Sequence, residues 1–184
     1  MSTFDPANYG PVFEPLLSTD RRRPLDAGRP DSAARAALKS LTVESAFKHL
    51  FDGSNRTSVT DSDMAACCIS GVWLLHNFLD ESHTLSQKID TTSGSYWHGI
   101  MHRREGDFSN AKYWFRHVGH HPVFELLANR LQTNTWDPFA FVDECQAAVR
   151  GKSNGLEQCL DIQQLEWELL FGYCYHAAIG RTDR

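Results

Sequence analysis

Two histidines four residues apart stand in the segment WHGIMHRREGD, residues 97–107. Residues four apart share one face of a helix, so His98 and His102 can offer two imidazole nitrogens to one divalent metal such as zinc. Glu105 follows on the same stripe, but about 10 Å along the axis from His98, which is too far for one ion to bind all three directly. Gly99 stands where the HExxH motif has its glutamate, so a metalloprotease is disfavoured. A polar helix face without a metal is the alternative reading of this pair.

A third ligand has to come from another segment. Five of the nine histidines fall within residues 98–121, a density well above a uniform scatter. Upstream, Asp80, His83 and Gln87 continue the helical line of an apolar segment, and they face the residues around 100 if that helix does not break near Asp80. We therefore predict a metal site formed by His83, His98 and His102, in which the ion activates water. Without a metal, His98, His102 and Glu105 would perform acid and base catalysis directly.

The two arginines of the segment raise the question of a ligand. Arg104 falls among apolar residues at the helical angle, and a guanidinium that loses water requires a carboxylate, a bound anion or access to solvent at the helix end. Its nearest acids are Glu105 and Asp107, although another helix can supply the partner. Arginine binds carboxylates and phosphates in bidentate fashion, so the open alternatives are a structural ion pair and recognition of a small anionic molecule. The candidate substrate-binding residues are Arg103, Arg104, Gln87, Asn110 and Tyr113.

The elements that must position these residues are predicted to be helices. From residue 31 onward the apolar residues recur at helical spacing, and no segment shows strand alternation with hairpin turns. The longest predicted helix runs from Met64 towards Ile89 and ends at TTSGS, residues 91–95; Gly106 ends the next one, and Asp107 can cap its successor. The expected fold is all-α, a single-domain bundle of about seven or eight helices over residues 31–184. Five prolines in residues 1–30 predict an extended arm without regular structure.

Composition limits the classes of function. Apolar residues make up 41% of the 184 residues, which is enough to build a core. The net charge of −5 gives no general attraction to nucleic acid or anionic lipid, and the short arginine clusters at 21–23 and 103–104 do not reverse it, so nucleic acid is a disfavoured partner. We expect no membrane segment and a cytoplasmic location, because no leader-like or sufficiently long apolar run is present. The five cysteines have no CxxC pair and are expected to be reduced core thiols.

Two resemblances concern the same region. EGDFSNAKYWFRHVGHHP, residues 105–122, resembles the second helix of a tetratricopeptide repeat, with Gly99, Ala111, Phe115 and Pro122 at similar spacings, which implies a helical hairpin. SHTLSQ at 82–87 together with residues 93–122 resembles a family of uncharacterised microbial helical proteins. That resemblance implies that one signature contains His83, His98, His102, Arg103, Arg104, Glu105, Asp107 and Asn110.

Two functions remain open at this point. The first is an enzyme or small-molecule-binding protein whose His/Arg/Glu pocket recognises an anionic ligand, with or without a metal. The second is a non-catalytic helical scaffold that binds a protein partner, in which the same polar residues form a buried network that fixes helix register. The first predicts a pocket with solvent access, and the second predicts a closed cluster or a groove.

Overall fold

The computed structural model describes residues 4–51 and 59–181, and this part of the chain is all-helical, as predicted. It contains ten α-helices and two short 3-10 helices, at Pro6–Tyr9 and Lys48–Phe51. The α-helices are α1 (Gly10–Leu17), α2 (Arg35–Lys39), α3 (Val43–Ala46), α4 (Ser62–Leu75), α5 (Leu79–Ser86), α6 (Thr92–Glu105), α7 (Phe108–Val118), α8 (Pro122–Leu131), α9 (Pro138–Val149) and α10 (Leu156–Ala178). The described residues include more helices than the seven or eight expected, because several short ones supplement the long ones.

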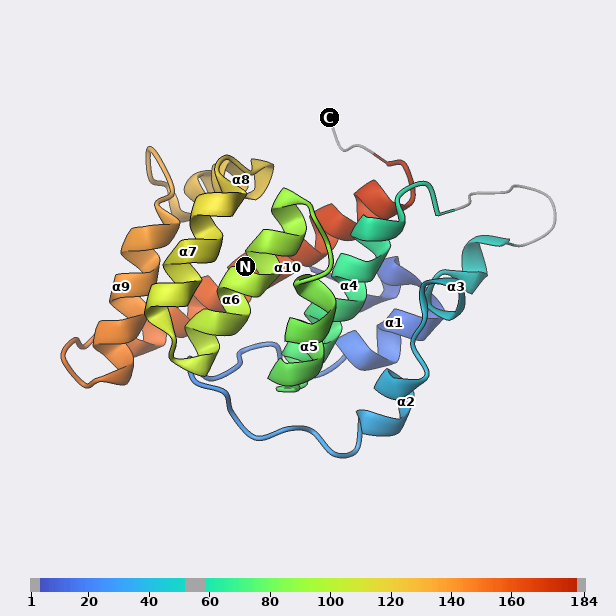
Figure 1. Ribbon diagram of the computed structural model, residues 1–184, viewed down its shortest axis with the longest axis horizontal. Coiled ribbons are helices and arrows are strands. Elements are labelled where there is room, and N and C mark those ends of the chain that lie inside the picture. Colours follow the sequence, from blue (N-terminus) through green and yellow to red (C-terminus); the bar gives the residue numbers. More distant parts are fainter. Residues whose placement is uncertain (1–3, 52–58, 182–184) are drawn as a thin grey trace.

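The longest helix, α10, forms the back of the bundle, and α4, α8 and α9 pack against it (Figure 1). Helix α6 lies between α4 and α5 on one side and α7 on the other, and α9 follows beyond α7. Helices α6 and α7 are joined by only two residues and pack side by side as a hairpin. In the described residues, no helix combines the length and the apolar character that a bilayer crossing requires.

Helix α6 is buried on all sides, although its sequence is polar. Every residue from Tyr96 to Arg104 is buried. The preceding helix has ended before TTSGS, as predicted, but this segment opens α6: Thr91 caps the helix by accepting a hydrogen bond from the backbone N–H of Gly94, and α6 begins at Thr92. The predicted end is confirmed: Gly106 adopts a left-handed conformation with φ of 89°. Asp107 caps α7 through the backbone N–H of Asn110, also as predicted.

The amino-terminal segment is not uniformly extended, so this expectation is wrong for residues 6–17. Helix α1 has Pro11 in its first turn, where a missing N–H costs nothing, and it also accommodates Pro15. Its buried side chains Phe13, Leu16 and Leu17 follow helical spacing and enter the main core. Burial of this apolar face outweighs the proline content.

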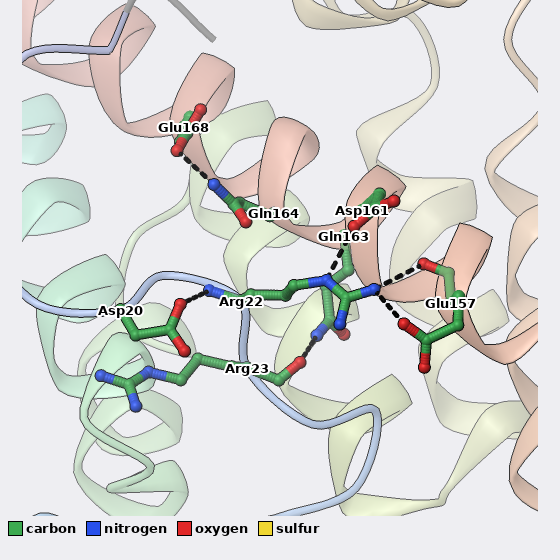
Figure 2. A network of polar contacts seen from close by, with 8 residues as sticks. All are labelled: Asp20, Arg22, Arg23, Glu157, Asp161, Gln163, Gln164 and Glu168. Carbon is green, nitrogen blue, oxygen red and sulfur yellow. Dashed lines mark hydrogen bonds and ion pairs between the residues drawn. The ribbon is translucent and has the colours of Figure 1, made fainter. Parts of the chain in front are cut away.

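The residues after α1 do lie extended over the bundle (blue segment along the lower edge of Figure 1). Figure 2 shows how they are fastened to α10: the Arg22 guanidinium donates to the carboxylates of Asp161 and Glu157, at 2.7 and 2.6 Å. The Gln163 amide donates to the carbonyls of Arg23 and Pro24. These side-chain bonds replace regular secondary structure as the means of holding the segment.

The predicted long helix from Met64 towards Ile89 breaks, so that part of the prediction is wrong. Helix α4 ends at Leu75, Asn77 has a positive φ of 61°, and α5 starts at Leu79. The break is stabilised from outside the helix, since the His76 imidazole contacts Asp31 and the Leu16 carbonyl, and the Asn77 amide donates to the Arg29 carbonyl. Asn tolerates the left-handed conformation better than most residues, which places the break here.

The five cysteines are free and buried, as predicted. Burial raises the pKa of Cys145 to about 12 and holds that of Cys68 well above its usual range. Both of these thiols are therefore protonated at neutral pH and act as small apolar side chains.

His121 makes stability depend on pH. Its Nδ1 accepts the backbone N–H of Val123 at the start of α8, and its Nε2 lies 3.0 Å from the Ser93 hydroxyl, so the ring is neutral with the proton on Nε2. Burial, together with the nearby His120, lowers the pKa of His121 to about 4. Below the unfolded pKa of about 6.5 the unfolded chain takes up a proton that the folded one does not. The free energy of unfolding should therefore fall by about 3 kcal/mol between roughly pH 6.5 and pH 4.

A His121→Asn variant keeps a capping side chain without a titrating group. Urea unfolding near pH 7.5 and pH 5 should show a smaller acid loss in this variant than in the wild type, by about 2 kcal/mol. The other buried histidines are present in both proteins and cancel in the comparison. Equal acid losses in the two proteins would contradict the role of His121.

Candidate metal centre

Three histidines from two helices meet at one point, and they are the three predicted as metal ligands. His83, His98 and His102 can each offer one imidazole nitrogen, and these atoms all lie within 4.8 Å of one another. The ring centroid of His83 is 4.6 Å from that of His98 and 5.4 Å from that of His102. The His98 and His102 rings stack at 4.8 Å, as expected for residues one turn apart.

The break after α4 does not prevent this meeting. It lets α5 fold back as a separate helix that packs on both α4 and α6, and His83 in its second turn then faces α6. Asp80 and Gln87, which share the predicted line with His83, are exposed. Of that line, therefore, only His83 belongs to the cluster.

His98 occupies a position suited to metal binding. Its ring stacks on Trp114 of α7 with centroids 3.8 Å apart, and the residue is only 1% exposed. Its Nδ1 is buried and has no hydrogen-bond partner among the described residues, which is an uncommon state for an imidazole nitrogen. Burial, with the nearby His102 and His83, lowers the pKa of His98 to about 3. The ring is thus neutral at physiological pH and has a lone pair to offer.

His102 is oriented by two polar neighbours. The Glu105 carboxylate lies 3.0 Å from its Nδ1, and the Asn110 amide nitrogen lies 3.0 Å from its Nε2. Burial lowers the pKa of His102, and Glu105 opposes that effect. If Nδ1 carries the proton, as in the carboxylate–histidine arrangement that supports metal ligands, Nε2 accepts from the Asn110 amide, which would have to turn aside for Nε2 to bind a metal. The Glu105 side chain is half exposed, at 52%. It contacts His102 from outside and does not enter the centre of the histidine cluster.

This geometry approaches that of a three-histidine zinc site. Nitrogens bound at 2.0–2.1 Å to a tetrahedral zinc ion are about 3.3 Å apart, so small side-chain rotations would bring the three rings into range. His83 is only half-buried, which leaves one side of the cluster near solvent. Three imidazoles with a side open to solvent leave room for an exchangeable fourth ligand.

Arg103, a predicted substrate-binding residue, lies elsewhere. It points towards α10, where its guanidinium pairs with the Glu166 carboxylate and stacks over the Phe141 ring at 4.5 Å. Tyr96 also donates its hydroxyl to Glu166, at 3.1 Å. Arg103 and Glu166 are both fully buried. The structural ion pair that the sequence left open for Arg104 is thus found at the neighbouring Arg103.

Arg104 has neither the acidic partner expected from the sequence nor access to solvent at the helix end. Among the described residues its guanidinium contacts only oxygen atoms of carbonyl and amide groups: it donates to the backbone carbonyls of Leu74, Asp26 and Ala27 and to the Asn77 side-chain amide. The bond to Leu74 gives a hydrogen-bond partner to a carbonyl group at the C-terminal end of α4. The bonds to Asp26 and Ala27 anchor the extended segment. Burial, with the like charges of Arg23 and Arg103, lowers the pKa of Arg104 to about 9.

The other predicted binding residues lie at different depths. Asn110 contacts His102, Tyr113 is 48% exposed beside Trp114, and Gln87 is exposed. Neither Trp114 nor Glu166 was predicted to be a site residue. Trp114 could have been found from its helical position, because it is one turn from Asn110 on α7; Glu166 gave no signal beyond being an acid within an apolar helix.

The comparisons with known proteins add no relative. No protein-family model matches the chain, and neither a curated protein nor a solved structure is significantly similar to it.

Proposed function

We propose that the protein binds a divalent transition metal, zinc being the preferred candidate, through His83, His98 and His102. The observation that carries the proposal is the convergence of three imidazole nitrogens within 4.8 Å. Two further observations support it: the unpartnered Nδ1 of His98 and the contact of Glu105 with His102. Imidazole nitrogen favours zinc and its neighbours over calcium or magnesium, which take oxygen ligands.

The metal would give the protein a site for a small anionic molecule. Three protein ligands leave the fourth position of a tetrahedral ion to water or to a ligand oxygen, as in catalytic rather than structural zinc sites. A bound water would be deprotonated near neutral pH and could attack an electrophilic substrate. Glu105 would position His102, and Asn110 on α7 contacts the same histidine. Arg103 and Arg104 take no part in this version of the function, because both are engaged in the interior.

Replacing His98 by alanine should weaken zinc binding roughly a hundredfold, because one of three ligands is removed. The measurement is calorimetric titration of zinc into chelator-dialysed protein, with elemental analysis of the dialysed complex. We expect one zinc per wild-type chain. Thermal unfolding should show a zinc-dependent rise in Tm for the wild type that is greatly reduced in the variant.

His117→Ala is the matched control. His117 is exposed and lies on the neighbouring helix, and within the described part of the chain its hydrogen bond is to the carbonyl of Tyr113, so its loss should leave zinc affinity within about twofold. Absence of zinc binding at micromolar concentration in the wild type would overturn the proposal. Equal zinc affinity in the His98 variant and the wild type would also overturn it.

A further inference from the structure

A second polar site lies on the other side of α6, between that helix, α10 and the extended segment. It is a small hollow of about 260 Å³, including the part open to solvent. Three arginines line it, Arg21, Arg23 and Arg104, together with Gln163. Its remaining lining is apolar and consists of Leu74, Leu75, Ile100 and Trp167. A low-dielectric wall around cationic groups strengthens their attraction for an anion.

The positive charge of the hollow exceeds the negative charge that contacts it. Arg21 is paired with Glu168 at 2.8 Å. Among the described residues, Arg23 and Arg104 have no carboxylate within ion-pair distance; the Arg23 guanidinium has the Thr19 hydroxyl as a partner, at 3.2 Å. The Nε of Arg23 is buried without a hydrogen-bond partner. In Figure 2 the Arg23 side chain turns away from Asp161 and Glu157, the acids that bind the Arg22 guanidinium. Burial lowers the pKa of Arg23, and the carboxylates of Asp20 and Asp31, which lie beyond ion-pair distance, oppose that effect only in part.

Gln163 adds a second unmatched group, an acceptor. The residue is 4% exposed, and its amide nitrogen donates to the carbonyls of Arg23 and Pro24. Two carbonyl partners fix the amide orientation, so the other amide atom is the oxygen. That oxygen is buried and has no partner among the described residues. A ligand that fills the hollow should therefore present anionic oxygens to the arginines and one O–H group to Gln163.

We infer that this hollow binds a small oxyanion that retains a hydroxyl group, with inorganic phosphate as its simplest representative. Arg23 binds the anionic oxygens with its free Nε–H, Arg104 adds positive charge from α6, and the Gln163 oxygen accepts the hydroxyl proton. The ligand thereby joins the extended segment to α6 and α10. The site is separate from the three histidines and does not depend on the proposed metal.

Phosphate and sulfate provide the sharpest test, because they share shape and anionic oxygens while sulfate has no O–H group at neutral pH. Binding is measured by calorimetry and by the rise in Tm, using protein dialysed free of metal and chelator. Wild-type protein should bind phosphate, with roughly tenfold weaker binding of sulfate, which leaves the Gln163 oxygen unpaired. Arg23→Gln should weaken phosphate binding at least about tenfold, through loss of one charged hydrogen-bond donor.

Arg22→Gln is the matched control. It removes an arginine next to Arg23 on the same segment, but one whose partners are the exposed acids of α10, so phosphate affinity should stay within about twofold. No binding of either anion by wild-type protein at millimolar concentration overturns the inference. So does full phosphate affinity in the Arg23 variant. Equal affinities for phosphate and sulfate overturn the assignment of a hydroxyl-bearing ligand, and wild-type protein alone suffices for that comparison.

Discussion

Replacing Glu166 by leucine should lower the free energy of unfolding by about 3–5 kcal/mol. Glu166 is fully buried on α10, and its carboxylate accepts hydrogen bonds from Arg103 and from the Tyr96 hydroxyl. Without it the Arg103 guanidinium remains in the interior with an uncompensated charge and no route to solvent. Urea unfolding followed by circular dichroism measures the loss.

The double variant Arg103→Met, Glu166→Leu separates the charge effect from general disruption. Removing both charges leaves no unpaired ion, so the double variant should be more stable than Glu166→Leu alone, although it carries more changes. Glu157→Leu serves as a control on the same helix, because its carboxylate is 76% exposed and its pair with Arg22 should contribute less than about 1 kcal/mol. A double variant as unstable as the sum of its single changes would contradict this account of the pair.

Gly94→Ala should cost about 3 kcal/mol, although alanine is the better helix former by about 1 kcal/mol. A methyl group at this position would lie 2.3 Å from the Ile89 carbonyl oxygen and 2.8 Å from its Cβ. The obstructing atom belongs to the main chain, so no side-chain rotation relieves the clash. Either α6 or the preceding turn has to shift, and the same turn connects α5 to α6.

Gly151→Ala provides the comparison for backbone strain alone. Nothing lies within 4 Å of a methyl group there, but the residue has a φ of 65°, so alanine should cost only about 1 kcal/mol. Thermal or urea unfolding of both variants ranks the two effects. If the Gly94 variant is no less stable than the Gly151 variant, the turn between α5 and α6 shifts at little cost in free energy, and the predicted clash is wrong.

The helices were largely predictable because their signals are local. Capping by Asp61 and Asp107, the left-handed Gly106 and the apolar spacing of α7 to α10 follow from neighbouring residues. The errors arose where distant contacts decide the outcome. Asn77 adopts its left-handed conformation where the extended segment packs on the end of α4, and α1 forms around its prolines because Phe13 enters the core. Neither contact can be read from a local pattern.

The candidate site was predictable in part for the same reason. His98 and His102 share a face because of helix geometry alone, whereas their contact with His83 depends on how α5 folds back after the break. The arginines illustrate the limit. Adjacent positions on a helix differ by about 100° in direction, so Arg103 faces α10 while Arg104 faces the end of α4. The spacing predicted that a buried guanidinium needs partners, but not which helix provides them.

The burial of the central run of α6 has a consequence for hydrogen exchange. A helix with an exposed face can open locally, whereas the Tyr96–Arg104 run is enclosed by its neighbours and can open only when the whole bundle unfolds. Its amide protons should therefore exchange at the rate set by global unfolding. Both proposed ligands bind side chains of this helix, so each would slow that exchange across the entire core, and their protective effects would add.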